Sequence, residues 1–425
     1  MRILLIGEYS NVHWTLAEGL RTLGHDVTVV SSGDGWKDYP RDIDLRRRHL
    51  DDPSPVKRIG GTIRYITDLA RVWPRLRGYD IVQLINPVFI ELRAERILPF
   101  YRFLRRHNRR IVLGAFGIDH YWVRVGMDCH TFRYSDFNFG TTLRSYPFMD
   151  TMIRDWLQGS KGDLNRLIAD DADAIVTGLY EYEACYRPFF PQKTTFIPFP
   201  IDRSSVTPSI LYPPCPPSSS PAVPSSTPSP SAPSPASAAS SPSSAVGSSL
   251  LLRVGGGSAA APPSLPPLRL FIGIQRTRSA YKGTDIMLSA LQRLKADFPD
   301  RIDILRAESV PFAKYQEMMN TSHVILDQLY SYTPAMNALL AMAKGIIVVG
   351  GGEPEHYDLL GEHQLRPIVN VQPTEQDVYD QILHRLILHP ETIRQLQLDS
   401  IEYIRRHHDH IAVARRYEAL YHKLL

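Results

Sequence analysis

Three basic side chains and a glycine lie close together about two thirds of the way along the chain. The segment from Gly273 to Gly283 follows an apolar stretch and contains Arg276, Arg278 and Lys282. Gly283 lets the backbone turn into a helix, and the free N–H groups and dipole at a helix start favour an anion. A guanidinium binds phosphate as a bidentate fork, and an ammonium binds it as a point charge. The segment predicts a site for the diphosphate of a phosphorylated ligand; the alternative is a basic surface loop that ends in a glycine.

A second segment with ligand-binding chemistry lies downstream, where another apolar stretch ends in three glycines. Gly350, Gly351 and Gly352 are followed by Glu353, Pro354 and Glu355. Glycine allows a close approach to the backbone that a side chain would block. The two carboxylates could accept hydrogen bonds from ribose or sugar hydroxyls. We predict a ligand-binding loop here, and the alternative is a tight surface turn with solvated glutamates.

Two loops in the N-terminal half also carry candidate residues. Asp119 and His120 follow a predicted strand, and either could orient an acceptor hydroxyl or act as a base. Tyr9, Asn11 and His13 follow the first strand and are expected at the same edge of the sheet, on the acceptor side. The alternative for both histidines is a structural role.

The candidate residues of the N-terminal half must be positioned by strands and helices, which alternate through residues 1–203. Short apolar stretches predict strands at 2–6, 27–30, 81–85, 111–115, 174–176 and 195–197. Helical spacing of apolar residues predicts helices at 12–23, 58–76, 91–107 and 151–170. Continuous apolar strands joined by helices indicate a parallel sheet covered on both faces.

The same alternation returns in residues 268–425. Strands are expected at 268–274, 302–306, 323–327 and 346–349, and helices at 284–296, 311–320, 334–344, 375–388 and 401–425. The prediction is an α/β protein with two Rossmann-like parallel-sheet domains that face each other across a cleft. The ligand is expected between the carboxyl ends of the strands. The final helix is expected to pack back on the N-terminal domain.

The segment 204–267 separates the two domains and has a different composition. Ser, Pro and Ala dominate it, and its only charged residue is Arg253. Too little apolar surface is available to offset the entropy of ordering, so we predict a disordered linker. A proline-rich tract that binds a partner is the alternative.

Bulk composition narrows the class of protein. The chain has 425 residues and a net charge of +4, and no apolar run is long enough to span a bilayer. Cys129, Cys185 and Cys215 show neither a metal-binding spacing nor a disulfide framework, which favours a reducing cytoplasm. Basic clusters at 46–48 and 105–110 predict solvated faces, or alternatively contact with the anionic inner face of the plasma membrane.

The catalytic motifs of several enzyme classes are missing. Gly7 is followed by Glu8 and Tyr9 where a dinucleotide-binding turn would continue with further glycines. The sequence contains no phosphate-binding P-loop, no zinc-protease helix motif and no nucleophile elbow. No nucleic-acid partner is expected.

Taken together, the motifs resemble the retaining GT-B glycosyltransferases of group 1, which include many enzymes of bacterial capsule and lipopolysaccharide synthesis. The likeness covers nearly the whole chain apart from 204–267. It rests on the segments 1–7, 23–30, 79–82, 172–176 and 197–202 in the first half, and on 281–283, 342–345 and 351–355 in the second.

The resemblance implies a UDP- or GDP-linked sugar donor on the C-terminal domain and a glycan or lipid-linked acceptor on the N-terminal domain. It also implies retention of the anomeric configuration and no metal or other cofactor. By position, Lys282 with Arg276 or Arg278 would hold the diphosphate, and His120 would lie near the catalytic histidine of the family.

One departure from the family pattern concerns its paired glutamates. Their positions are occupied here by Tyr332 and Leu340, and leucine cannot bond a ribose hydroxyl. Glu353, Glu355 and Asn337 are the candidates for this role. The departure also motivates an alternative function, a catalytically degenerate GT-B protein that acts as a sugar-binding or partner subunit.

Overall fold

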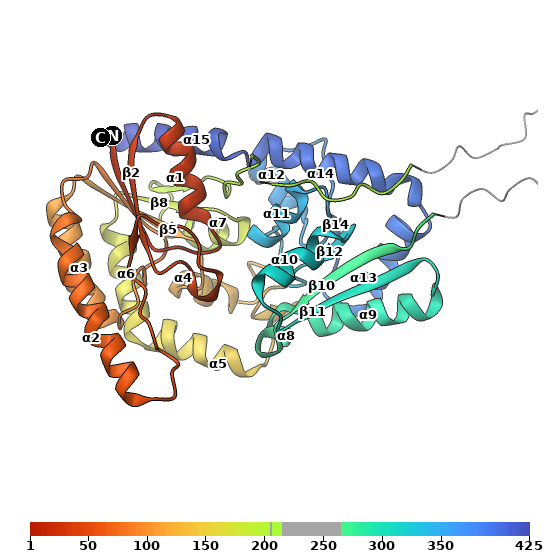
Figure 1. Cartoon of the computed structure of the whole chain (residues 1–425), viewed down its shortest axis with the longest axis horizontal. Coiled ribbons are helices and arrows are strands. Elements are labelled where there is room, and N and C mark those ends of the chain that lie inside the picture. Colours follow the sequence, from red (N-terminus) through yellow and green to blue (C-terminus); the bar gives the residue numbers. More distant parts are fainter. Residues whose placement is uncertain (205, 215–264) are drawn as a thin grey trace, which may run out of the picture. The chain divides into compact units, whose positions relative to one another are not determined.

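The computed structural model describes residues 1–204, 206–214 and 265–425. The predicted linker 204–267 therefore lies mostly outside the described residues, as does Cys215. Met1–Pro213 and Pro267–Leu425 belong to one compact unit (Figure 1). We call residues 1–204 the N-terminal lobe and residues 265–425 the C-terminal lobe.

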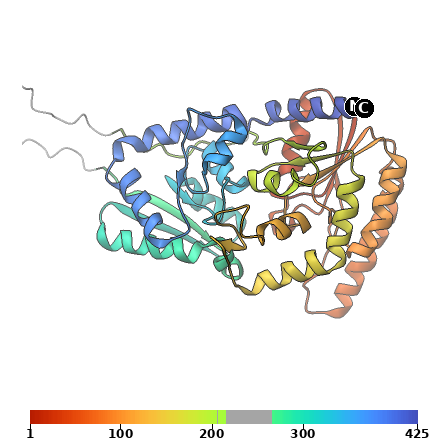
Figure 2. The same ribbon diagram turned by 180° about the vertical axis from the view of Figure 1, so that it is seen from behind.

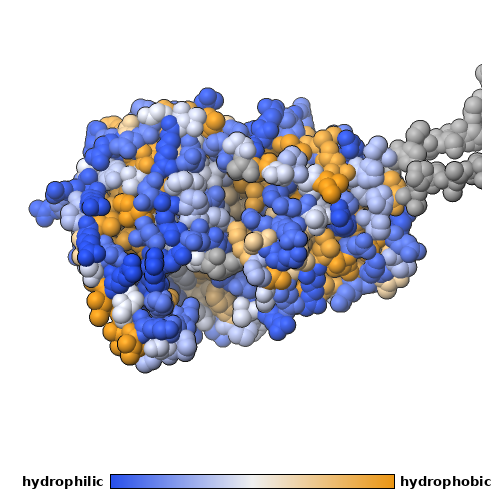
Figure 3. All heavy atoms as spheres, viewed as in Figure 1, coloured by the Kyte–Doolittle hydropathy of each residue, from blue (hydrophilic) through white to orange (hydrophobic). Residues whose placement is uncertain are grey.

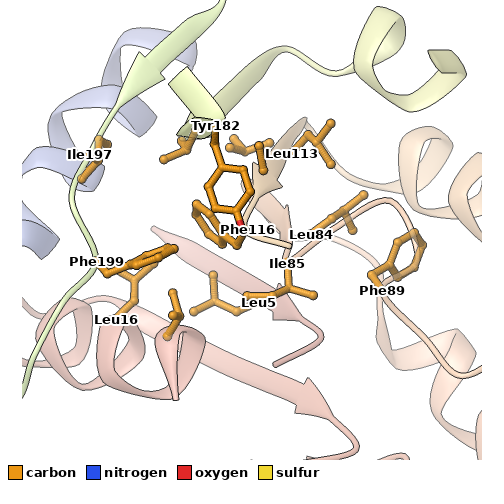
Figure 4. Close-up of a cluster of buried hydrophobic side chains, with 14 of the residues drawn as sticks. Leu5, Leu16, Leu84, Ile85, Phe89, Leu113, Phe116, Tyr182, Ile197 and Phe199 are labelled. Carbon is orange, nitrogen blue, oxygen red and sulfur yellow. The ribbon is translucent and has the colours of Figure 1, made fainter. Parts of the chain in front are cut away.

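The N-terminal lobe is built on a seven-stranded sheet of order β3-β2-β1-β4-β5-β8-β9, in which every neighbouring pair is parallel. The strands are β1 (Arg2–Ile6), β2 (Asp26–Ser31), β3 (Ile43–Asp44), β4 (Ile81–Leu84), β5 (Arg110–Ala115), β8 (Ala174–Thr177) and β9 (Thr194–Phe196). Leu5, Leu84 and Leu113 from three adjacent strands are fully buried with Phe116 and Phe199 (Figure 4). Burial on both faces explains why these strands are continuously apolar in sequence.

Helices join the strands of this sheet. They are α1 (Val12–Thr22), α2 (Pro55–Val72), α3 (Ala94–His107), α4 (His120–Gly126), α5 (Pro147–Ile153), α6 (Ser160–Asp171) and α7 (Tyr180–Tyr186). The prediction of one helix over 151–170 is wrong, because a π-helical turn at Arg154–Gln158 and Gly159 separate α5 from α6. A small antiparallel hairpin, β6 (Asn138–Phe139) with β7 (Thr142–Leu143), lies between α4 and α5.

The C-terminal lobe has a parallel sheet of order β11-β10-β12-β13-β14. Its strands are β10 (Leu268–Ile274), β11 (Ile302–Glu308), β12 (Val324–Leu326), β13 (Ile347–Gly350) and β14 (Val369–Asn370). Its helices are α8 (Ser279–Lys282), α9 (Thr284–Asp297), α10 (Phe312–Asn320), α11 (Met336–Ala343), α12 (Pro354–Leu360), α13 (Glu375–Ile382) and α14 (Ile393–His407).

The end of the chain forms two helices where one was predicted over 401–425. α14 ends at His407 and α15 (His410–Leu424) begins after Asp409, whose carboxylate accepts the backbone N–H groups of Ile411 and Ala412. An aspartate in this N-cap position starts a new helix because it satisfies N–H groups that have no partner within the helix. α15 packs on α1, and the Tyr421 hydroxyl donates to Oε1 of Gln83 at 2.7 Å. The two chain ends lie side by side in both views (Figures 1 and 2).

Residues 206–213 lie along the C-terminal lobe. Tyr212 is buried and its backbone N–H donates to Oε1 of Gln397 at 2.7 Å, and the Ser209 N–H donates to the Lys344 carbonyl at 2.7 Å. These contacts keep the first part of the segment 204–267 in the compact unit.

Candidate functional site

A cavity of about 1070 Å³ opens at the carboxyl ends of the strands in both sheets. The N-terminal lobe contributes the loops after β1 and β2. The C-terminal lobe contributes the loops after β10, β11 and β12 together with the start of α11. Ligands of doubly wound α/β folds bind at this edge, because loops from neighbouring strands converge there.

Lys282 and Arg278 supply positive charge to the cavity wall. Lys282 ends α8, and Gly283 after it has a φ of 71°, a left-handed conformation that glycine adopts without strain. The Lys282 ammonium makes no hydrogen bond to another described residue, and its charge lowers the pKa of Asp327 against the larger effect of desolvation. The Arg278 guanidinium lies 5.7 Å from the centre of the Phe148 ring. Both cations remain available to an anionic ligand.

Arg276 differs from these two residues. It does not line the cavity, it is exposed, and it forms an ion pair with Glu308. Of the three basic residues predicted for the diphosphate, the structure therefore brings together Arg278 and Lys282.

A hydrogen-bonded cluster of Asp327, Asn337 and Tyr315 lines the cavity in the C-terminal lobe. The Asn337 amide donates to Oδ1 of Asp327 at 3.1 Å and to the Tyr315 hydroxyl at 3.0 Å. Desolvation raises the pKa of the Asp327 carboxyl. Sequence reasoning selected Asn337 and missed Asp327 and Tyr315, although Asp327 directly follows β12 at the ligand-facing edge.

The two positions of the missing glutamate pair have different surroundings. Leu340 lies in the cavity wall, where its side chain offers no hydrogen bond to a ribose. Tyr332 is buried and stacks on Tyr180 with ring centroids 5.5 Å apart, and its hydroxyl accepts the Arg133 backbone N–H at 2.7 Å. Tyr332 thus joins the two lobes.

The N-terminal lobe adds polar groups from two loops. The Lys37 ammonium donates to Oδ2 of Asp34 at 2.7 Å and to the Ser10 hydroxyl at 3.1 Å. Asn11 donates its side-chain amide to Thr15, and its Oδ1 is buried without a hydrogen-bond partner among the described residues. All of these residues line the cavity. Sequence reasoning placed Asn11 here and missed the loop after β2.

His13 and Tyr9 do not line the cavity. His13 is fully buried in the N-terminal lobe, with Nδ1 2.8 Å from the Gly7 carbonyl and Nε2 3.2 Å from the Gln83 amide nitrogen. Desolvation lowers its pKa to about 3, so the ring is neutral. The Tyr9 ring packs near Gly117.

Asp119 and His120 also lie outside the cavity lining. Asp119 caps α4, accepting the Trp122 N–H at 2.9 Å and the Tyr186 hydroxyl at 2.7 Å, and burial raises its pKa to about 6. The Nδ1 of His120 lies 2.8 Å from the Trp156 carbonyl, while its Nε2 is buried without a partner among the described residues. Desolvation lowers the pKa of His120.

The carboxylate of Glu353 after the three glycines is buried and fully occupied. It accepts the Tyr134 hydroxyl at 2.5 Å, the Arg133 guanidinium at 2.7 Å, the Gln372 amide at 2.8 Å and the Asn370 amide at 2.9 Å. Arg133 also pairs with the neighbouring glutamate, Glu355. Arg133 and Tyr134 belong to the N-terminal lobe, so these contacts hold the two lobes together.

The glycines of this loop pack against the protein itself. A Cβ on Gly351 would lie 2.1 Å from the Ser331 carbonyl oxygen, and the Gly352 N–H donates to Oδ1 of Asn370 at 2.9 Å. The close approach that Gly351 permits is therefore to the chain's own backbone. Gly351, Gly352, Glu353 and Glu355 do not line the cavity.

Solved structures share this architecture. No protein-family model matches the chain, and no curated protein matches its sequence. Sucrose-phosphate synthase from Thermosynechococcus elongatus aligns with 100% of this chain and 99% of its own, with a TM-score of 0.56 and 13% identity. HepE from Anabaena, in complex with UDP and glucose, covers 99% of both chains with a TM-score of 0.53 and 11% identity. HepE in complex with UDP-glucose gives a TM-score of 0.52 and 12% identity.

These likenesses and the two parallel sheets define the class of fold. The chain has the GT-B fold of two Rossmann-like domains, and the predicted fold class is confirmed. Within the described residues, no helix combines the length and apolar character needed to cross a bilayer.

Proposed function

We propose that the protein is a glycosyltransferase that moves a sugar from a nucleotide-diphosphate donor to an acceptor hydroxyl. The observation that carries this proposal is the cavity at the strand ends, where Lys282 and Arg278 present cationic groups. The fold, shared with a protein whose structures contain UDP and UDP-glucose, supports it.

The donor in this proposal is a UDP- or GDP-linked sugar. Its diphosphate lies against Lys282 and Arg278, beside the start of α9, which no side chain caps and whose dipole favours an anion. These cations offset the diphosphate charge, so the reaction needs no metal or other cofactor. Asn337 takes the hydroxyl-binding role for which the family uses a glutamate.

The acceptor is a glycan or lipid-linked hydroxyl that enters on the N-terminal side, beside Asn11 and Lys37. Transfer proceeds with retention, in the synthesis of a surface polysaccharide. Asp119 and His120 are kept as catalytic candidates on the resemblance alone, because neither reaches the cavity wall.

A second function is favoured by the apolar wall at Leu340 and by the occupied carboxylate of Glu353. Both features leave the ribose of the donor with fewer hydrogen-bond partners than a typical donor site provides. A GT-B protein that binds a sugar or a partner without catalysis would fit these features.

Calorimetry with UDP, UDP-sugars and GDP-sugars tests the diphosphate site. Lys282→Ala removes a charged hydrogen-bond donor, so UDP binding should weaken about thirtyfold while the protein stays folded. Arg276→Ala is the matched control, because Arg276 is basic, nearby and paired with Glu308 outside the cavity. Equal affinities of both variants and the parent protein would contradict the assignment.

A turnover assay separates the two functions. Release of UDP or GDP with a mass increase in an added acceptor supports the enzyme. Tight nucleotide-sugar binding with no release across a broad acceptor panel supports the degenerate protein. Sugar phosphate as the product would indicate a phosphorylase instead.

A further inference from the structure

An apolar stripe on α2 faces solvent. Val56, Ile59, Ile63 and Ile66 follow helical spacing and have exposed fractions of 76%, 61%, 61% and 46%. The opposite face of α2 is buried in the N-terminal lobe. In the view of Figure 3, hydrophobic residues reach the surface at the lower left, where α2 runs in Figure 1. A contiguous set of large exposed aliphatic side chains marks an interaction surface, whereas single ones do not.

One border of the stripe is a basic row on the same helix. Lys57, Arg64 and Arg71 recur every seven residues, so they share one face of α2 beside the stripe. All three are exposed. Two aspartates offset part of their charge: Asp68 lies 3.6 Å from Arg64 and 3.4 Å from Arg71, and Asp52 lies 3.5 Å from Lys57.

The other border is the loop from Arg46 to Leu50, which crosses α2. The Arg47 guanidinium donates to Oγ1 of Thr62 at 2.9 Å, and a Cβ on Gly61 would lie 2.1 Å from the Arg48 carbonyl oxygen. Leu50 is half exposed at the tip of this loop and extends the apolar surface. Residues 46–75 contain eight Lys or Arg side chains against three Asp. Asp38 and Asp44 pair with Arg46 and Arg48, and the surface keeps an excess of positive charge after these pairs are counted.

We propose that α2 and the loop 46–50 form a docking surface for an anionic lipid bilayer. The aliphatic stripe enters the boundary between headgroups and acyl chains, and the two basic borders contact lipid phosphates. A second copy of the chain fits less well, because a symmetric contact between two stripes would bring their basic borders together. The proposal is independent of the donor site, and it would bring the cavity to acceptors that are carried on lipids.

Vesicle co-sedimentation of the full chain tests this surface. We expect binding to phosphatidylcholine vesicles that contain phosphatidylglycerol, weaker binding at high salt, and little binding to phosphatidylcholine alone. The double variant Ile59→Asn with Ile63→Asn should reduce vesicle binding about tenfold or more, because two exposed aliphatic side chains no longer leave water. Leu388→Asn with Leu398→Asn, which changes two exposed leucines of the C-terminal lobe, is the matched control.

Charge variants give a second measurement. Replacing Lys57, Arg64 and Arg71 with Gln should lower affinity for the anionic vesicles by about fivefold for each charge. The proposal is overturned if the parent protein ignores anionic vesicles or if the stripe variant binds like the control. The proposal is also overturned if analytical ultracentrifugation shows that the parent protein is a dimer and that the Ile59→Asn/Ile63→Asn variant is a monomer. Calorimetry with UDP on the same variants should be unchanged, so failure of the donor site is measured separately.

Discussion

Two loops that follow strands of the C-terminal sheet differ in how their charges are satisfied. The loop after β10 carries Lys282 into the cavity, and its ammonium makes no hydrogen bond to another described residue. The loop after β13 carries Glu353, whose carboxylate accepts four hydrogen bonds from its own chain. Both loops combine glycine with charge at a strand end. A ligand can use the first charge, whereas the second is already used to join the lobes.

The source of the difference is a segment of the N-terminal lobe between α4 and α5. It contains Arg133 and Tyr134, which reach the glutamates of the C-terminal lobe. A second contact adds to it, since the partly buried Glu181 accepts the backbone N–H groups of Tyr332 and Thr333 at 2.8 and 3.2 Å. The loop after β13 therefore belongs to an interlobe cluster of six residues: Arg133, Tyr134, Glu181, Tyr332, Glu353 and Glu355.

The largest expected effect comes from breaking this cluster. Glu353→Ala leaves the Tyr134 hydroxyl and one side of the Arg133 guanidinium unpaired, and should lower the free energy of unfolding by about 3 kcal/mol. Urea denaturation measures the loss. Affinity of the folded fraction for UDP should stay unchanged in calorimetry. A variant of normal stability with weak UDP binding would show instead that Glu353 contacts the ligand.

A smaller effect on the free energy of unfolding should follow from a substitution of Asp136, which lies in the same segment between α4 and α5. Tyr281 donates its hydroxyl to Oδ2 of Asp136 at 2.9 Å, and burial raises the pKa of this carboxyl to about 7. The folded state therefore holds a proton that the unfolded chain releases at lower pH. The stability from this proton is fully present below the unfolded pKa and is lost as pH rises through the folded one.

Asp136→Asn should remove this pH dependence because the amide stays neutral. Between about pH 5 and pH 8 the variant should lose about 2 kcal/mol less unfolding free energy than the parent protein, as measured by urea denaturation at each pH. Asp150→Asn, at an exposed position of α5, is the control for a surface carboxylate. Parallel pH profiles of parent protein and variant would show that Asp136 is ionised throughout.

The strand pattern was predictable because burial on both faces leaves a continuous apolar run that a sequence shows directly. The β10 prediction matches the structure residue for residue, and Lys282 was placed at the cavity because it follows this strand. The pairing of Glu353 with Arg133 could not be predicted, since it joins residues 220 positions apart through a loop without regular periodicity. The sequence predicts His13 at the cleft because it follows β1. In the structure His13 belongs to α1 and its ring is buried in the core.

The same substitution at two asparagines compares the cavity with the interlobe cluster most directly. Asn337→Ala removes an amide that bonds Asp327 in the cavity, and should weaken UDP binding about fivefold with little change in stability. Asn370→Ala removes an amide that bonds Glu353, and should lower the free energy of unfolding by about 1 kcal/mol with UDP affinity unchanged. Calorimetry and urea denaturation on both variants give four values. The comparison fails if both asparagines affect the same quantity, because the cavity and the interlobe cluster would then share a single function.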